Sequence, residues 1–440
     1  MSALIQFSVT NYRSFHETAV LSMVAPAGTT EGTLRVPGNP SLHLLRMAAL
    51  FGANASGKTN MLRALGALTA LVLGHPLDAV VDPFRLTQAG ATAPTEFQWD
   101  GVVGQAQVSY VLVCTAREIQ SEALYTVDPS GGETTVFERE PGSAVPLRLG
   151  ALMGAEGSVQ RQFLLLNAQG TPRDQLLLRD LVLRSRDTPH RVALLDGLFD
   201  AFAKEMLFMT PSTAYDPFNN REAEVARLRA VGDLLARYDT GIDALNVRPV
   251  EGVVPPEWRG SDPRLLALKQ DFALKGIYLR DRGDPDAAPE VIELLADHRG
   301  ADGRVAPLRF VDESDGTRRL LHMLPVLQLA VSGIRVLIDE LDQSLHAAVA
   351  QQFLRDFLAL RTEDQLLFTT HDSTILDVAE LPSAAVWFVE KDLSGGSRLH
   401  SLAEVKSEQL ARLTGQRAAA YLQGRFGGVP RILSGRASGA

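Results

Sequence analysis

The sequence has few of the features that mark secreted or membrane proteins. Cys114 is the single cysteine among 440 residues, which excludes an internal disulfide. No apolar run approaches the ~18 residues of a transmembrane helix, and the first residues lack the basic and apolar regions of a signal peptide. We therefore expect a cytoplasmic protein with no membrane partner, in which Cys114 is a packed, inert thiol inside a strand.

The sequence has no excess of basic charge, because 52 acidic residues outnumber 43 lysines and arginines. The formal net charge is −9, which argues against a uniformly basic nucleic-acid-binding protein. The charge is uneven, however, because the sequence after Glu408 has no acidic residue and five arginines, at positions 412, 417, 425, 431 and 436. A solvated tail is the simpler interpretation, and a docking surface for phosphate or an acidic partner is the alternative.

One motif organises the chain. The residues from Gly52 to Thr59 read Gly-Ala-Asn-Ala-Ser-Gly-Lys-Thr, between the apolar run 47–51 and a helix-like stretch from Asn60. A strand, a glycine-rich loop and a helix are the context in which G-x-x-x-x-G-K-[ST] forms a phosphate-binding loop. The glycines let successive N–H groups point at phosphate oxygens, and the following helix adds the positive end of its dipole. The pattern predicts binding of ATP or GTP.

The residue types assign roles within this loop. Lys58 is expected to bridge the β- and γ-phosphates, and the Thr59 hydroxyl to take one Mg²⁺ coordination position. The predicted nucleotide-binding residues of this segment are Gly52, Asn54, Ala55, Ser56, Gly57, Lys58, Thr59 and Asn60.

A second motif supplies the acids that hydrolysis needs. Val336-Leu-Ile is an apolar strand that ends in Asp339 and Glu340. Side chains alternate along a strand, so the two carboxylates point in different directions. We expect Asp339 to reach the Mg²⁺ shell and Glu340 to act as general base for water. Without a P-loop upstream, such a pair is more often a solvated turn.

Two further stretches have a plain and a functional interpretation. Ser314 and Gly316 begin a helix, where Ser314 is either a simple N-cap or part of an anion site for a γ-phosphate presented by another subunit. His371 follows the strand 365–369 and is predicted to hydrogen-bond the γ-phosphate.

The remaining pattern predicts an α/β fold with a helical insertion. We expect an ATPase lobe with a β subdomain over 1–150, a helical insertion over 151–304, a second ATPase lobe over 305–403 and a basic tail over 404–440. Residues 25–41, rich in glycine and proline, are expected to form a loop. Frequent prolines exclude a long coiled coil in the insertion. Strands are predicted at 3–9, 18–23, 47–51, 95–100, 105–114, 305–311, 334–338, 365–369, 385–389 and 398–402.

The order of these motifs resembles the ABC-type ATPase heads of the SMC, RecF and OLD-like group. The similarity is closer to the RecF/OLD-like "AAA-type" ATP-binding proteins often found beside phage-defence genes. It rests on the motifs above and on the stretches 4–15, 313–320, 338–346, 386–392 and 421–426. The resemblance implies an ABC-type head with a mixed core sheet and an antiparallel β subdomain, and it implies ATP rather than GTP.

The resemblance also implies a composite site. Two heads would sandwich two ATP molecules, with Ser314 and Gly316 of one subunit on the γ-phosphate held by the other. Asn54 would position the attacking water or the γ-phosphate, Arg13 would lie near the ribose or α-phosphate, and Gln88 is the candidate Q-loop ligand of Mg²⁺. By the resemblance, the helix start at Ser314-Asp-Gly316 corresponds to the signature motif of ABC-type ATPases. The sequence departs from the family pattern at Asp315 and Thr317 in this motif, and at His346 and Ala347, which follow the acids Asp339 and Glu340.

These features favour a dimeric or higher-order ATPase that regulates a separately encoded effector, with a role in phage defence. The sequence after the last predicted strand is too short for the nuclease domain of OLD proteins, so we expect any toxic chemistry on another polypeptide. The alternative is a RecF-like repair ATPase that binds DNA directly, through the basic tail or the insertion. A P-loop kinase leaves Ser314 and His371 unexplained, and a transporter subunit does not fit the insertion.

Overall fold

The computed structural model of the chain forms two compact units, each built from several segments. The first comprises Met1–Phe208, Val331–Asp339 and Glu363–Ala440, and the second comprises Met209–Ala330 and Glu340–Thr362. The structure describes residues 2–30, 32–142, 146–218, 224–250, 263–280, 289–378, 380–405 and 415–429. No helix in these ranges is long and apolar enough to cross a membrane.

The first unit contains a seven-stranded antiparallel sheet of order β10-β9-β8-β7-β6-β1-β2. Parts of β6 and β7 alternate buried and less buried positions, as expected for a sheet with one face on a core. The strands are β1 (Ser2–Thr10), β2 (Ala19–Ser22), β6 (Thr95–Val103), β7 (Ala106–Cys114), β8 (Ile119–Val127), β9 (Glu133–Arg139) and β10 (Leu147–Leu149).

The same unit contains a six-stranded mixed sheet of order β11-β16-β17-β5-β18-β19. Strands β16, β17, β5 and β18 are parallel neighbours, and the first three are buried along their whole length, which explains their continuous apolar sequences. The bounds are β5 (Met47–Phe51), β11 (Met206–Met209), β16 (Arg335–Ile338), β17 (Gln365–Thr369), β18 (Val386–Lys391) and β19 (Ser397–Ser401).

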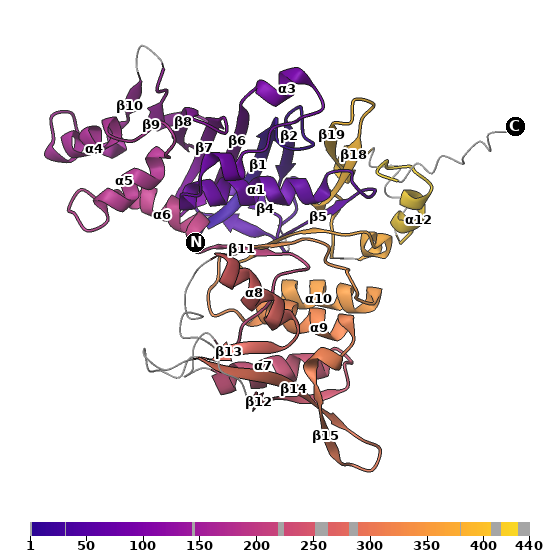
Figure 1. Cartoon of the computed structure of the whole chain (residues 1–440). Helices are drawn as coiled ribbons and strands as arrows, with labels where there is room; N and C mark the ends of the chain where they lie inside the picture. Colours follow the sequence, from indigo (N-terminus) through magenta and orange to yellow (C-terminus); the bar gives the residue numbers. More distant parts are fainter. Residues whose placement is uncertain are drawn as a thin grey trace, which may run out of the picture. The chain divides into compact units, whose positions relative to one another are not determined.

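A buried amide connects the two sheets of the first unit. The Gln365 side chain on β17 accepts a hydrogen bond from Leu4 N–H (2.6 Å) and donates one to Leu4 O (2.9 Å) on β1. Both groups are buried, so this pairing satisfies polar atoms that would otherwise be costly inside a core. Helix α1 (Lys58–Leu73) packs on β17 and on β1, and so spans the two sheets (Figure 1).

Helices α4 (Val159–Gln169), α5 (Leu177–Ser185) and α6 (Ala193–Ala203) pack against one another in the first unit. Buried Glu122 on β8 fixes the start of α5, because its carboxylate accepts from the N–H groups of Leu177 (2.6 Å) and Leu178 (2.8 Å). The Tyr110 hydroxyl also donates to it, at 2.9 Å. Short helices α2 (Leu77–Val80), α3 (Gln88–Thr92) and α12 (Arg417–Leu422) complete the unit.

In its described residues, the second unit combines a four-stranded antiparallel sheet with four α-helices. Strand β14 (Glu290–Arg299) pairs with β12 (Ile242–Pro249), β13 (Ile277–Arg280) and β15 (Val305–Arg309), and the β14–β15 hairpin projects beyond the other strands of its sheet (Figure 1). Helix α7 packs on β12 and α8 on β13. The helices are α7 (Glu224–Arg237), α8 (Pro263–Leu274), α9 (Asp315–Met323) and α10 (Ala347–Leu360).

These sheets confirm the predicted α/β class with a mixed core sheet and a separate antiparallel sheet. Two local predictions are wrong. The interval 151–304 is not purely helical, because it also contains β11, β12, β13 and β14. The expected loop at 25–41 contains β3 (Leu34–Val36) and the start of β4 (Asn39–Leu44), where buried Leu34, Val36 and Leu44 pack on Ala3 and Val102. Most of the basic tail lies outside the described residues.

Candidate functional site

The P-loop follows buried strand β5, and its last two residues, Lys58 and Thr59, begin α1, as the motif predicts. Its two glycines have positive φ, 154° at Gly52 and 115° at Gly57. A Cβ at Gly52 would meet the carbonyl oxygen of Val389, and one at Gly57 would meet the hydroxyls of Ser397 and Ser14. Glycine is therefore required at both positions for conformation and for space. Ala55 also has a positive φ, 60°, which shows how sharply the loop turns.

Lys58 is 5% exposed, and its side chain folds back onto the start of the loop. Its Nζ donates hydrogen bonds to the carbonyl oxygens of Gly52 (2.9 Å) and Ala53 (3.1 Å). An ammonium group this deeply buried needs such acceptors, and the oxygens of a nucleotide phosphate are stronger ones because they carry charge. The role of Lys58 toward the β- and γ-phosphates stays a prediction.

Thr59 and Asp339 meet although 280 residues separate them. The Thr59 hydroxyl donates to Asp339 Oδ1 at 2.9 Å, and the Thr369 hydroxyl donates to the same oxygen at 2.7 Å. The parallel register explains the meeting, because β5, β16 and β17 are neighbours and all end at one edge of the sheet. Asp339 was a predicted Mg²⁺ ligand, whereas the contribution of Thr369 was not foreseen.

The donor set at this edge suits Mg²⁺. It consists of a carboxylate and two hydroxyl oxygens, the hard ligands that Mg²⁺ prefers, and a P-loop magnesium takes its remaining ligands from nucleotide phosphates and water. Within the described ranges, no group of three or more His, Cys, Asp or Glu side chains is placed to hold a metal by itself.

Two serines that sequence reasoning missed support the loop. The Ser14 hydroxyl accepts from Asn60 Nδ2 at 2.8 Å, and the Ser397 hydroxyl donates to the Ser56 carbonyl. Ser397 N–H also donates to Ser14 O at 2.6 Å, which connects β19 to the turn before β2. Ser14 lies in a stretch that the resemblance had marked, but nothing in the sequence around Ser397 indicated this role.

Other predicted residues of the first unit are placed as follows. Asn54 is exposed on the P-loop, and Ser56 is buried. Arg13 pairs with Asp82, whose carboxylate is 3.5 Å from Arg13 Nε. Gln88 is exposed at the first residue of α3, next to the N-cap Thr87. Arg13 and Gln88 thus remain predictions for the nucleotide-bound state.

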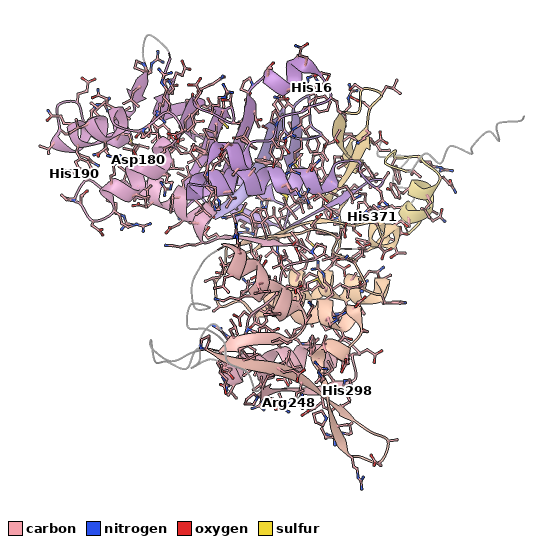
Figure 2. All side chains as sticks on the ribbon, viewed as in Figure 1. His16, Asp180, His190, Arg248, His298 and His371 are labelled. Atoms are coloured by element: carbon pink, nitrogen blue, oxygen red, sulfur yellow. The ribbon has the colours of Figure 1, made fainter. Side chains whose placement is uncertain are left out.

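His371 follows β17 by two residues and is exposed, in the position that Figure 2 labels. Thr369, at the end of the same strand, bonds Asp339. Strand β17 therefore places the Thr369 hydroxyl on Asp339, and His371 follows two residues later. The role of His371 on the γ-phosphate stays a prediction.

The predicted signature lies in the second unit and begins α9. Ser314 is the N-cap, and its hydroxyl accepts from Thr317 N–H at 3.1 Å. A Cβ at Gly316 would lie 2.6 Å from the carbonyl oxygen of Ser344, so only glycine allows this close approach. Glu313, just before the cap, contacts His298 Nε2 on β14 at 2.7 Å (Figure 2 labels His298).

Glu340 directly follows Asp339 and has a positive φ of 51°. Its carbonyl oxygen accepts from Gln343 N–H at 3.1 Å, and Ser344 also has a positive φ, 61°. Two left-handed non-glycine residues in five positions mark a tightly turned segment, a feature that clusters at functional sites. His346, where the family pattern has aspartate, caps α10 by accepting from Ala348 N–H at 3.2 Å.

The C-terminal segment reaches the P-loop. The Tyr421 ring stacks on Phe388 at 5.4 Å, and its hydroxyl donates to Gly428 O at 3.0 Å. Gly428 N–H donates to the Glu390 carboxylate. A Cβ at Gly428 would lie 3.5 Å from Gly52 Cα, so this segment packs directly on the first glycine of the loop. The stretches 386–392 and 421–426, distant in sequence, therefore meet beside the nucleotide-binding loop.

Residues 189–377 match a family model described as "AAA domain, putative AbiEii toxin, Type IV TA system". The match covers less than half of the chain and includes Ser314, Gly316 and the acids Asp339 and Glu340. Together with the P-loop, it supports a P-loop ATPase of the AAA/ABC type. No curated protein matches the chain.

Solved SMC heads are similar over most of their length. The SMC head bound to the C-winged helix domain of ScpA has 13% identity, covers 93% of this chain and 99% of its own, and has a TM-score of 0.41. The Thermotoga maritima head has 13% identity, 90% and 98% coverage and a TM-score of 0.33. The Pyrococcus yayanosii head has 10% identity, 97% and 100% coverage and a TM-score of 0.41.

Proposed function

We propose that this chain hydrolyses ATP with Mg²⁺ at a site that a second copy completes. The observation that carries the proposal is the meeting of Thr59, Asp339 and Thr369 at the end of the P-loop. These side chains come from three adjacent strands or their following loops, as the ligands of a nucleotide-bound magnesium do in P-loop NTPases. If the P-loop were only a turn, a carboxylate beside the Thr59 hydroxyl would have no evident role.

Each residue of the site has a distinct role in this proposal. The N–H groups of the loop and of the start of α1 hold the phosphates, and Lys58 moves its hydrogen bonds from Gly52 and Ala53 to the phosphate oxygens. Thr59 and Asp339 hold Mg²⁺, which neutralises charge on the transferring phosphoryl group when bound. Glu340 takes a proton from the attacking water, and His371 donates to the γ-phosphate.

The second copy contributes the signature. The N-terminus of α9, which Ser314 caps, offers N–H groups to the γ-phosphate on the P-loop of the partner. Gly316 lies in its first turn, close to the Ser344 carbonyl oxygen. ATP then bridges the two copies, and hydrolysis releases them. The close contact of Gly316 with Ser344 supports this role, because it ties the helix start to the segment that follows Glu340 within one copy.

We further propose that this cycle controls a separate effector protein, in defence against phage. The family model supports this part, since its description connects an AAA domain with a toxin–antitoxin system. Affinity purification of a tagged Glu340→Gln chain from its native host, with ATP and Mg²⁺, should recover a stoichiometric protein that is absent after Lys58→Ala. Recovery of nucleic acid instead, lost at high salt, would favour the DNA-binding alternative.

Solution mass tests the composite site. Glu340→Gln removes the general base but keeps the shape of the side chain, so it should trap the ATP-bound assembly. Light scattering should show ATP and Mg²⁺ converting this variant to a larger species, and Ser314→Arg in the same background should abolish the change. If the solution mass does not change with ATP although the nucleotide binds, the assignment of Ser314 and Gly316 to a site shared by two copies is wrong. An enzyme that acts as a single copy is then the better account.

Release of inorganic phosphate from ATP tests the chemistry separately. The unmodified chain should hydrolyse ATP in the presence of Mg²⁺, and Glu340→Gln and Lys58→Ala should each abolish turnover. Lys58→Ala should also lose nucleotide affinity, whereas Glu340→Gln should retain it. Turnover that survives Glu340→Gln would remove that residue from the proposed mechanism.

A further inference from the structure

The most deeply buried member of the Thr59–Asp339 cluster is Thr369, the last residue of β17. Thr369 is 0% exposed, whereas Thr59 and Asp339 are both partly exposed. The Thr369 hydroxyl donates to Asp339 Oδ1 at 2.7 Å, and the Thr59 hydroxyl donates to the same oxygen at 2.9 Å. A metal that enters from solvent reaches Thr59 and Asp339, but Thr369 is enclosed. The Thr369 hydroxyl therefore serves the carboxylate rather than the metal itself.

The register of the core sheet holds Thr369 in this place. Strands β16 and β17 are parallel, and their last pair in register is Ile338 with Phe368. Asp339 and Thr369 are the next residues of the two strands, and paired positions of neighbouring strands share a face of the sheet. On its other side β17 pairs with β5, where Thr369 lies opposite Leu50. A strand on each side thus fixes the backbone of Thr369, and its branched side chain has little rotamer freedom.

Two hydroxyl groups orient the Asp339 carboxylate. Each oxygen of an ionised carboxylate has about two acceptor sites, and Thr59 and Thr369 supply one proton each to Oδ1. Thr59 belongs to the P-loop, the segment predicted to contact nucleotide, whereas Thr369 belongs to the buried sheet. Thr369 therefore gives the carboxylate an anchor that does not depend on the nucleotide.

We propose that Thr369 is a positioning residue, which holds the Asp339 carboxylate in the geometry that Mg²⁺ requires. This inference rests on the proposed function, in which Thr59 and Asp339 hold Mg²⁺. Groups that hydrogen-bond a metal ligand orient it, and their loss weakens metal affinity or activity by about 10- to 100-fold. Mg²⁺ demands near-ideal octahedral geometry, whereas Ca²⁺ accepts irregular geometry. Thr369 is therefore expected to favour Mg²⁺ over Ca²⁺.

Thr369→Val tests this inference, because valine keeps the branched shape of the buried side chain and removes the hydroxyl. Each full-length chain is mixed with a fluorescent, non-hydrolysable ATP analogue, and Mg²⁺ or Ca²⁺ is titrated in separate experiments. The half-saturating concentration of Mg²⁺ should rise about tenfold or more in Thr369→Val, and that of Ca²⁺ should rise less. Thr369→Ser keeps the hydroxyl and should recover most of the Mg²⁺ affinity.

Thr69→Val is the matched control. Thr69 is also buried, at 6% exposed, and its hydroxyl donates to Leu65 O at 2.9 Å within α1. It lies on the same helix as Thr59 but about 15 Å further along the axis. Its substitution should leave the Mg²⁺ affinity unchanged. Circular dichroism and thermal melting check that each variant is folded.

Four results would overturn the inference about Thr369. The first is a Thr369→Val chain that binds Mg²⁺ as tightly as the unmodified chain. The others are equal weakening of Mg²⁺ and Ca²⁺, a Thr369→Ser chain that binds Mg²⁺ no better than Thr369→Val, and the same loss in Thr69→Val. Each of these three would assign the effect to packing rather than to the orientation of the carboxylate.

Failure of the proposed function gives a different result. In that case Mg²⁺ would not change binding of the analogue to the unmodified chain, which would overturn the metal site and the role of Thr369 together. If the unmodified chain depends on Mg²⁺ and Thr369→Val depends on it equally, the inference about Thr369 fails alone.

Discussion

The Thr59 hydroxyl lies 2.9 Å from Asp339 Oδ1, so the end of the P-loop and the end of strand β16 form one cluster. We predict that Asp339→Asn retains the fold but lowers Mg²⁺-dependent ATP hydrolysis by about 100-fold or more, because the amide has lost the charge that holds the metal. Phosphate release at saturating Mg²⁺ measures this. Activity close to that of the unmodified chain would exclude Asp339 as the metal ligand.

Gly57→Ala should abolish nucleotide binding. The residue has φ 115°, and a Cβ there meets the hydroxyls of Ser397 and Ser14, so the loop must shift. Equilibrium binding of a fluorescent ATP analogue measures the loss. Gly104→Ala is the matched control, because Gly104 also has a positive φ, 64°, but nothing lies within 4 Å of its Cβ position. It should cost about 1 kcal/mol of stability and leave binding unchanged. Equal binding by both variants would contradict this account.

Gly316→Ala tests the proposed role of the signature motif (Ser314–Gly316) independently of the P-loop. The new methyl group would lie 2.6 Å from Ser344 O, which forces α9 away from the turn after Glu340. ATP affinity of the isolated copy should be unchanged, whereas ATP-dependent association and turnover should fall together. Binding titrations and light scattering on the same sample measure both quantities. A loss of ATP affinity with association intact would be the opposite of this expectation.

Acidification should destabilise the protein through His322. Burial lowers its folded pKa to about 4, below the ~6.5 of an unfolded histidine, so between these values the unfolded chain binds the proton. The contribution of neutral His322 to the free energy of unfolding is fully present above pH ~6.5. It is lost as the pH falls toward 4, which lowers the free energy of unfolding by about 3 kcal/mol at most.

Urea unfolding, measured from pH 7 to pH 4, tests this prediction. The His322→Asn chain is the comparison, since it lacks the titrating group but keeps an acceptor for Tyr215 N–H, which donates to His322 Nδ1. The free energy of unfolding of the variant should depend less steeply on pH than that of the unmodified chain. Identical slopes in the two proteins would show that His322 is not buried in its neutral form.

The strands that build the site could be predicted where their sequence is a short apolar run. β5, β16 and β17 are buried along their whole length, and each is followed by the residues that carry chemistry, so pattern and motif agreed. In the second unit, β15 was predicted as part of the strand 305–311, whereas β12, β13 and β14 were not. β12 alternates buried and exposed positions only in part, so its sequence lacks a clear strand pattern.

By itself the sequence determined the local chemistry of this protein. The glycines, Lys58 and Thr59 of the P-loop, and the acids after an apolar strand, are adjacent in the chain, and their spacing alone fixes what they offer to a nucleotide. Only the tertiary structure decided which distant groups join them. Thr369 bonds Asp339, and Ser397 bonds the P-loop. The reason is physical: strand order and register bring residues together, and no local pattern encodes them.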